Sequence, residues 1–126
     1  MRRLHSTKGP DLCERTFKFG VRITKMVRRL PRDVAGHEIG RQVLRSGTSV
    51  GANTEEADAA ESTDDFLHKL KIALKEAQET RFWLRNIRES ELLVDKEVDA
   101  LLQEINELVK ILNTIITNTV RNKSAK

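Results

Sequence analysis

Apolar residues recur at every third or fourth position along most of the chain, which is the spacing of amphipathic α-helices. In residues 11–30 they form a single seam along one side of the expected helix. The seam consists of Leu12, Phe19, Ile23, Met26 and Leu30. Asp11 is suited to cap the start of this helix, and Pro31 is expected to end it after Leu30.

Residues 33–60 contain several glycines, each of which lowers helix propensity by about 1 kcal/mol relative to alanine. The periodicity nevertheless predicts a helix, because a helical repeat runs through Ile39, Val43, Ser46, Val50, Asn53 and Ala57. Beside that repeat lies a smooth strip of Gly40, Leu44, Gly47 and Gly51. We expect the strip to let another backbone approach closely, which offsets the propensity cost.

Two further helices are predicted in the second half of the chain. Ser62, with Asp65 three residues later, resembles a capping box and starts a helix that reaches residue 89. Its seam is Phe66, Leu70, Ala73, Ala77, Thr80, Leu84 and Ile87. The last helix has the broadest apolar stripe, which consists of Val94, Val98, Leu101, Ile105, Leu108, Leu112 and Ile115.

Four amphipathic segments joined by short connections predict an all-α, antiparallel up-down-up-down four-helix bundle. Strand signals are absent from the sequence, which has no Tyr and little alternation at period two. A chain of 126 residues forms one domain. We expect a flexible basic tail at residues 1–10, the bundle at residues 11–121 and a polar tail at residues 122–126.

Positive charge is concentrated in the first part of the chain. Residues 1–50 contain 12 Lys and Arg against 4 Asp and Glu, whereas residues 51–126 contain 11 against 15. On the first helix a row of cations repeats at helical spacing, which favours an anionic partner over an ordinary solvated face. Together with two neighbouring arginines, the row gives the candidate nucleic-acid-binding residues Arg15, Lys18, Arg22, Lys25, Arg28, Arg29 and Arg32.

The sequence offers no candidate for catalysis. No nucleophile has a base beside it, no metal-ligand spacing occurs, and no phosphate-binding loop is present, so we expect neither an enzyme nor a cofactor. Cys13 is the only cysteine, which suits a reducing compartment. Arg2 and Arg3 precede no apolar run, and no run is long enough to span a bilayer, so a cytoplasmic protein without a membrane partner is expected.

A polar constellation lies on the second and third helices. Its members share the faces that flank the apolar seams, and they are Arg41, Arg45, Ser49, Asn53, Glu56, Glu76 and Glu79. Arg41 and Arg45 are placed to pair with Glu76 and Glu79 across the helix boundary. Three interpretations remain open: a structural network that fixes helix register, a ligand or phosphate pocket, and a charge network at a subunit interface.

The same segments carry a family resemblance. The stretch RQVLRSGTSVGAN at residues 41–53, followed by Glu56 and Ala57, resembles the signature of the bacterial four helix bundle proteins, the 23S rRNA intervening-sequence protein family. A second block that begins at Asp65 and ends at Leu84 resembles the family in the same order. Many members have Gly where this chain has Ala57. The match covers residues 11–121.

The resemblance implies properties that the spacing alone does not. Family members tend to assemble as ring-shaped homopentamers. They are similar to the accessory variability proteins of diversity-generating retroelements, which bind nucleic acid through a basic surface. A homo-oligomer that binds RNA more readily than DNA is therefore expected.

Two functional hypotheses follow from the sequence. The first is a non-enzymatic module that binds RNA by its phosphates with weak sequence specificity, since the few aromatic residues mostly fit packed helices. Phe17 lies off the apolar seam and is the aromatic candidate for base stacking. The second is a structural adaptor whose basic face docks a protein partner such as a polymerase. A membrane-surface helix is disfavoured, because the bundle needs the apolar seam of the first helix.

Overall fold

The computed structural model describes residues 3–4 and 11–125. The chain forms four helices and the described residues contain no strand. The helices are α1 (Leu12–Val27), α2 (Val34–Asp58), α3 (Thr63–Glu89) and α4 (Lys96–Ser124). The four predicted helices are confirmed in number, order and approximate extent.

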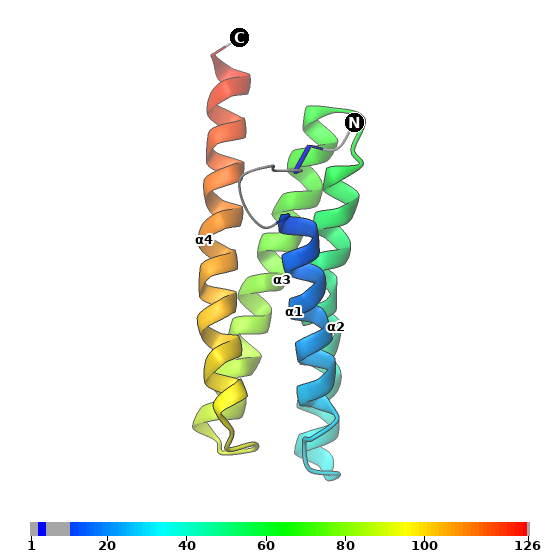
Figure 1. The fold of residues 1–126 in the computed structure, drawn as a ribbon, viewed down its shortest axis with the longest axis vertical. Helices are drawn as coiled ribbons and strands as arrows, with labels where there is room; N and C mark the ends of the chain where they lie inside the picture. Colours follow the sequence, from blue (N-terminus) through cyan, green and yellow to red (C-terminus); the bar gives the residue numbers. More distant parts are fainter. Residues whose placement is uncertain (1–2, 5–10, 126) are drawn as a thin grey trace.

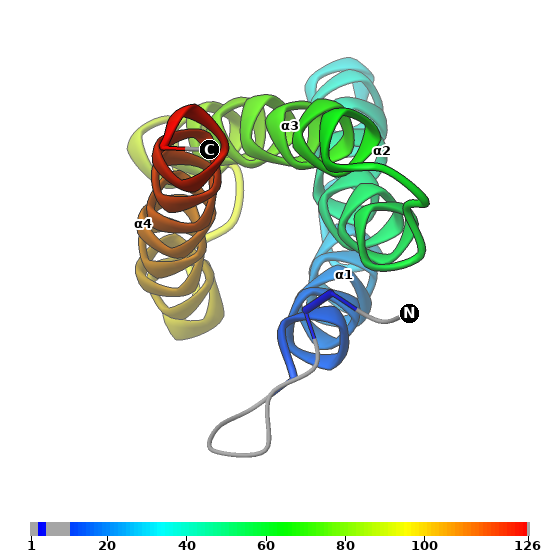
Figure 2. The ribbon, with the colours of Figure 1, turned by 90° about the horizontal axis from the view of Figure 1, so that it is seen from above.

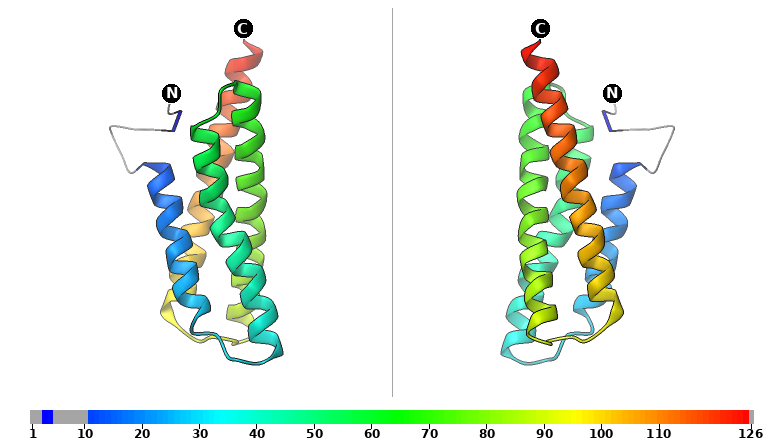
Figure 3. Two further views of the ribbon diagram at one scale, coloured as in Figure 1. Left: turned by 90° about the vertical axis from the view of Figure 1, so that its right-hand side faces the viewer. Right: turned by 90° about the vertical axis from the view of Figure 1, so that its left-hand side faces the viewer.

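Successive helices run in opposite directions, so that the chain passes down, up, down and up along the long axis of the molecule (Figure 1 and Figure 3). Helix α1 packs along α2, α2 along α3, and α3 along α4, whereas α1 and α4 approach each other less closely (Figure 2). This is the predicted antiparallel up-down-up-down arrangement of a four-helix bundle. The turn between α1 and α2 lies at the lower end in Figure 1.

Each helix begins at a side chain that accepts a hydrogen bond from a backbone N–H of the first turn. Asp11 accepts from the N–H of Cys13, and Ser62 accepts from the N–H of Asp65, as the sequence predicts. The α2 and α4 helices are capped in the same way by Asp33 and Asp95. These caps satisfy donors that the helix itself leaves without a partner.

The predicted seams form the core. All five seam residues of the first helix and all seven of the third are buried. On α4 the seam is buried from Val98 to Leu112, but Val94 is highly exposed. The prediction for Val94 is wrong because this residue precedes the cap Asp95 and therefore lies in the turn before the helix.

Helix α1 ends earlier than the sequence predicts, at Val27 rather than Leu30. Beyond Arg28 the backbone tightens, since the N–H groups of Arg29 and Leu30 donate to carbonyls only three residues back. Leu30 remains buried, so the tight turn still contributes to the core.

The glycine strip on α2 faces α1, as predicted. A Cβ added to Gly51 would lie 3.1 Å from the backbone carbonyl of Thr16, and one added to Gly47 would lie 3.0 Å from the side chain of Ile23. The absence of side chains at these positions lets the two helices pack closely, and packing stabilises a helix whose propensity is low.

The structure describes only part of the two predicted tails. Most of residues 1–10 lies outside the described residues, but Leu4 is described, and its N–H donates to Asp58 at 2.7 Å. At the other end α4 continues to Ser124 and so includes part of the predicted polar tail. An ion pair between Lys123 and Asp64, at the start of α3, holds these last turns against the bundle.

Candidate nucleic-acid interface

The predicted row of cations lies along α1 and the turn that follows it. Three of its arginines point to α4, where they form ion pairs with carboxylates. Arg15 binds Glu104 through two hydrogen bonds of 2.7 and 2.8 Å and also reaches Glu107 at 3.0 Å. The three arginines therefore bridge α1 and α4, which pack less closely than the other neighbouring helices.

The other two pairs repeat this arrangement further along the edge. Arg22 binds Glu97 through two hydrogen bonds of 3.0 Å. Arg29 binds Asp95, the capping residue of α4. The pairs of Arg15 and Arg22 each use two parallel hydrogen bonds, which is the stronger kind of charge-assisted contact, whereas Arg29 uses one.

The Arg15 pair is the least exposed of the three, with side-chain exposures of 28% for Arg15 and 17% for Glu104. Its hydrogen bonds lower the pKa of Glu104 from the usual glutamate value, against the opposing effect of partial burial. The hydrogen bond from Arg29 lowers the pKa of Asp95 in the same way. The fold thus uses three cations of the row to neutralise its own acidic α4.

The remaining predicted cations are exposed. Lys18 has only a long contact of 4.0 Å with Glu14 on its own helix. Within residues 3–4 and 11–125, Lys25, Arg28 and Arg32 form no ion pair. These three lie at the end of α1 and in the turn to α2, so three unpaired cations lie together at one end of the bundle.

A hollow of about 400 Å³ lies at this end, between the last turn of α1 and the first turns of α2. Arg28 and Arg32 line it, and so do His37 and Arg41 from α2. We call it the basic hollow. Neither His37 nor Arg41 was predicted to lie on the basic surface, although their spacing of four residues on one helix puts them on one face.

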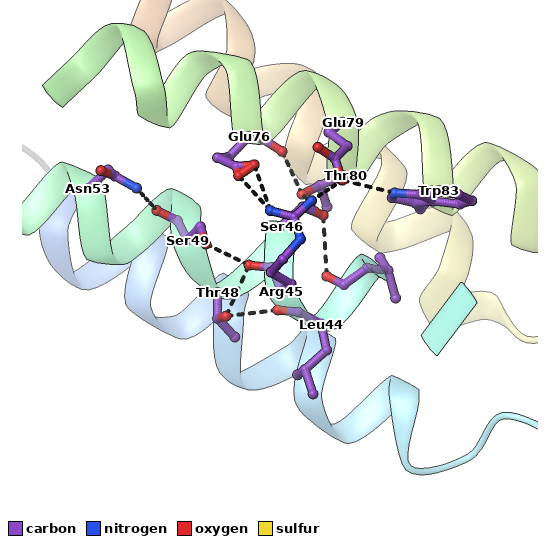
Figure 4. A network of polar contacts seen from close by, with 11 residues as sticks. Leu44, Arg45, Ser46, Thr48, Ser49, Asn53, Glu76, Glu79, Thr80 and Trp83 are labelled. Carbon is purple, nitrogen blue, oxygen red and sulfur yellow. Dashed lines mark hydrogen bonds and ion pairs between the residues drawn. The ribbon is translucent and has the colours of Figure 1, made fainter. Parts of the chain in front are cut away.

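The polar constellation lies at the seam between α2 and α3 (Figure 4). Arg45 binds Glu76 at 3.0 Å and also binds Glu79, which in turn accepts a hydrogen bond of 3.2 Å from the indole N–H of Trp83. Partial burial favours the neutral form of Glu79, but the hydrogen bonds from Trp83 and Arg45 outweigh it and lower its pKa. Arg45 itself is half exposed.

The rest of the constellation continues along α2. Ser49 donates to the carbonyl of Arg45 at 2.7 Å, and the Asn53 side chain donates to the carbonyl of Ser49 at 2.9 Å. Glu56 pairs with Lys69 of α3 at 2.8 Å. The contacts that join two helices are therefore those of Arg45 and Glu56, which supports the register interpretation.

Arg41 departs from its predicted position. It pairs with Glu38 of its own helix at 3.0 Å and does not reach Glu76 or Glu79. The reason is its place on α2: it lies one turn closer to the α1–α2 end than Arg45 and lines the basic hollow. Arg41 therefore belongs with the basic surface and not with the α2–α3 network.

A second, less polar groove of about 290 Å³ lies between α1 and α2, further from the turn. Phe17 lines it with 55% of its surface exposed, and Val21 lies beside it. Phe82 on α3 is comparably exposed and packs edge-on against Trp83, a feature that the sequence analysis missed.

The α1–α4 ion pairs were also missed, but a signal for them exists. Arg15 and Arg22 are seven residues apart, and so are Glu97 and Glu104. Oppositely charged rows with a seven-residue repeat pair in reverse order when two antiparallel helices lie side by side. The rule applies only once it is known that the first and last helices are neighbours.

Metal-ligating side chains do not gather anywhere in the described part of the chain: no three of His, Cys, Asp and Glu lie close enough to hold an ion. Of the helices formed by the described residues, none combines the length and apolar character that crossing a bilayer requires.

The architecture places the chain in the class of all-helical, four-helix bundle proteins. Its sequence matches the family described as 23S rRNA-intervening sequence protein over residues 10–114, and the chain belongs to this family. The fold is also similar to the crystal structure of a protein of unknown function from the S23 ribosomal protein family of Bacteroides thetaiotaomicron. The two chains are 37% identical, the match covers 83% of this chain and 97% of the other, and the TM-score is 0.77. No curated protein matches the chain.

Proposed function

We propose that this protein is a non-enzymatic module that binds nucleic acid, with RNA preferred over DNA, through contacts to phosphates. The observation that carries the proposal is a group of exposed cations at one end of the bundle that form no ion pair with the described residues, Lys25, Arg28 and Arg32. Cations of this kind release counterions from a polyanion, which is the main source of affinity that does not depend on sequence.

Weak sequence specificity follows from the position of the aromatic residues. Readers of single strands stack bases on exposed aromatic rings. The exposed ring on α1 belongs to Phe17, eleven residues before Arg28, which is about 16 Å along a helix. Contacts to phosphates do not distinguish RNA from DNA. The preference for RNA is therefore supported by the family to which the chain belongs, whose description refers to 23S rRNA.

The proposal is tested by titrating the purified protein against labelled single-stranded and double-stranded RNA and the matching DNA. Salt is varied between about 50 and 200 mM, over which a protein with 6–10 phosphate contacts loses roughly 10³–10⁵ in affinity. Steep salt dependence with the tightest binding to RNA is the expected result. No binding to any of the four polymers at the lowest salt would contradict the proposal.

We also propose that the protein assembles as a homopentamer and that it acts in the cytoplasm. The support for the pentamer is the resemblance to ring-forming family members. A ring of five copies would present five sets of the exposed cations to one polyanion, and several weak sites on one particle bind far more tightly than one.

A second candidate function is a structural adaptor that docks an acidic protein partner. The observation that favours it is the groove beside Phe17 and Val21, which adds exposed apolar surface to the flank of the basic row. The partner would meet Lys18 and Lys25 with carboxylates and fill the groove with an apolar side chain. A partner that survives nuclease treatment but is lost from a Val21→Asp variant supports this function, whereas loss on nuclease treatment counts against it.

A further inference from the structure

The basic hollow differs from an ordinary charged surface in that its cations surround one concave space. Arg28 and Arg32 line it from the end of α1 and the following turn, while Arg41 lines it from α2, together with His37. Among the described residues, no carboxylate lines it. An anion in this space would therefore be met by positive groups from two elements at once.

The cations of the hollow are available to a ligand. Arg28 and Arg32 are exposed and take part in no ion pair with the part of the chain that the structure describes. Arg41 is held only by Glu38, and both side chains are largely exposed, at 73% and 61%. Exposed pairs of this type contribute little stability, so a better anion displaces Glu38 at small cost.

The shape of the hollow is fixed by tight local packing. Asp33 accepts a hydrogen bond of 2.8 Å from the N–H of Gly36, and the carbonyl of Pro31 rests where a Cβ of Gly36 would be. Val27, Leu30 and Leu44 supply apolar walls.

The arrangement favours a single phosphate group over a continuous backbone. A strand that followed α1 would need the whole row of cations, but Arg15, Arg22 and Arg29 are engaged with α4. A phosphate monoester carries close to two negative charges at pH 7 and three free oxygens, whereas a diester within a strand carries one charge. Several guanidinium groups around one space match the monoester better.

We propose that the basic hollow is a binding site for a phosphate monoester, with Arg28 and Arg32 as its principal ligands and Arg41 as a third. The source of the monoester is either the terminal phosphate of a nucleic acid or a free phosphate compound such as a nucleotide. If the monoester is the end of a nucleic acid, the inference rests on the proposed function, because the hollow would then hold the end of that nucleic acid. If it is a free phosphate compound, the inference does not depend on the proposed function.

The test compares one single-stranded RNA oligonucleotide in two forms, with a 5′-phosphate and with a 5′-hydroxyl group. We expect the phosphorylated form to bind about tenfold more tightly, the effect of one or two charge-assisted hydrogen bonds. A double variant, Arg28→Gln with Arg32→Gln, is expected to lose this preference. The control matched in charge is Arg85→Gln with Arg121→Gln: both are exposed arginines that do not line the hollow, and this variant should keep the preference.

A third variant tests the role of Arg41, and it is expected to raise the preference for the 5′-phosphate instead of removing it. Glu38→Gln removes the carboxylate that holds Arg41 and leaves the cations of the hollow unchanged. We expect it to raise the preference for the phosphorylated RNA severalfold. An unchanged or lower preference would remove Arg41 from the proposed site.

Inorganic phosphate and adenosine monophosphate distinguish the two sources. Both are titrated while the amide signals of Gly36, His37 and Gly40 are followed by NMR. Saturable shifts with these small compounds, together with equal affinity for the two RNAs, would assign the hollow to a free phosphate compound.

Three outcomes separate this inference from the proposed function. Salt-dependent RNA binding without a 5′-phosphate preference and without shifts from phosphate overturns the monoester site and leaves the proposed function standing. Shifts from phosphate without RNA binding support the site and contradict the proposed function. Absence of both overturns the two together.

Discussion

At the residue scale, Gly36 has the tightest surroundings of the α1–α2 turn. A Cβ at this position would lie 1.8 Å from the carbonyl oxygen of Pro31, which is backbone and has little freedom to move away. We expect Gly36→Ala to lower the free energy of unfolding by about 1–3 kcal/mol, the usual cost of overpacking. Urea unfolding followed by circular dichroism measures it.

Gly20→Ala is the matched control. Its Cβ would lie 3.6 Å from the Cα of Thr48, an ordinary contact, and alanine favours a helix over glycine by up to about 1 kcal/mol. This variant should be as stable as the wild type or more so. Equal losses in the Gly36 and Gly20 variants would contradict the special role of the Pro31 contact.

Residue-scale features were predictable from the sequence where their cause is local. Asp11 and Ser62 cap their helices as predicted, because a cap needs only the side chain and the next few N–H groups. The contact between Gly36 and Pro31 was not predictable, since it depends on the path of the turn. Arg41 pairs with Glu38 and not with α3 for a similar reason: its partner depends on where along α2 the neighbouring helix presents carboxylates.

At the element scale, α1 and α4 pack less closely than the other neighbouring helices, and ion pairs cross the edge between them. The edge is therefore expected to weaken in acid. Glu104 has a lowered pKa in the folded protein, mainly because Arg15 hydrogen-bonds to its charged form. A carboxylate with a lowered pKa contributes stability above its unfolded pKa, near 4.5, and loses it as the pH falls through the lower folded value.

The measurement is the urea midpoint from pH 7 to pH 3, for the wild type and for Glu104→Gln. The wild type should be the more stable of the two at pH 7, and the difference should shrink as the pH drops below 4.5. Glu107→Gln, which alters the more exposed partner of Arg15, should show a smaller difference. A difference between wild type and Glu104→Gln that stays constant down to pH 3 would contradict the account of this edge.

The helices themselves were predictable because a seam at a spacing of 3.6 residues is visible in one dimension. The seams of α1 and α3 are buried without exception. The engagement of Arg15, Arg22 and Arg29 by α4 was not visible, since periodicity shows which residues share a face but not which face another helix covers. The candidate interface therefore lies at the end of α1 and not, as the sequence predicted, along the whole helix.

At the scale of the whole molecule, assembly is the property that one chain does not display. If the protein is a homopentamer, light scattering after gel filtration should give five times the 14.4 kDa mass of one chain. A mass of 14.4 kDa at micromolar concentration would contradict the pentamer. It would leave the basic hollow intact, because all its lining residues come from one chain.

The charge of the molecule has a simple organisation. The basic residues 1–50 and the acidic residues 51–126 partly neutralise each other across the α1–α4 edge. Three of the cations that stay unpaired within the described part of the chain, Lys25, Arg28 and Arg32, lie together at the α1–α2 end. The asymmetry of the sequence predicted an anionic partner, and the fold narrows the surface on which that partner is proposed to bind.

The most direct test of this account is the salt dependence of RNA binding in two triple variants with the same change in net charge. One variant replaces Lys25, Arg28 and Arg32 with glutamine, and the other replaces three exposed cations elsewhere, Arg85, Lys110 and Arg121. The account predicts that the first variant binds single-stranded RNA more weakly, with a log–log salt slope smaller by about 2, while the second keeps the wild-type slope. Equal weakening in both variants would show that net charge alone drives binding and would contradict an interface at the α1–α2 end.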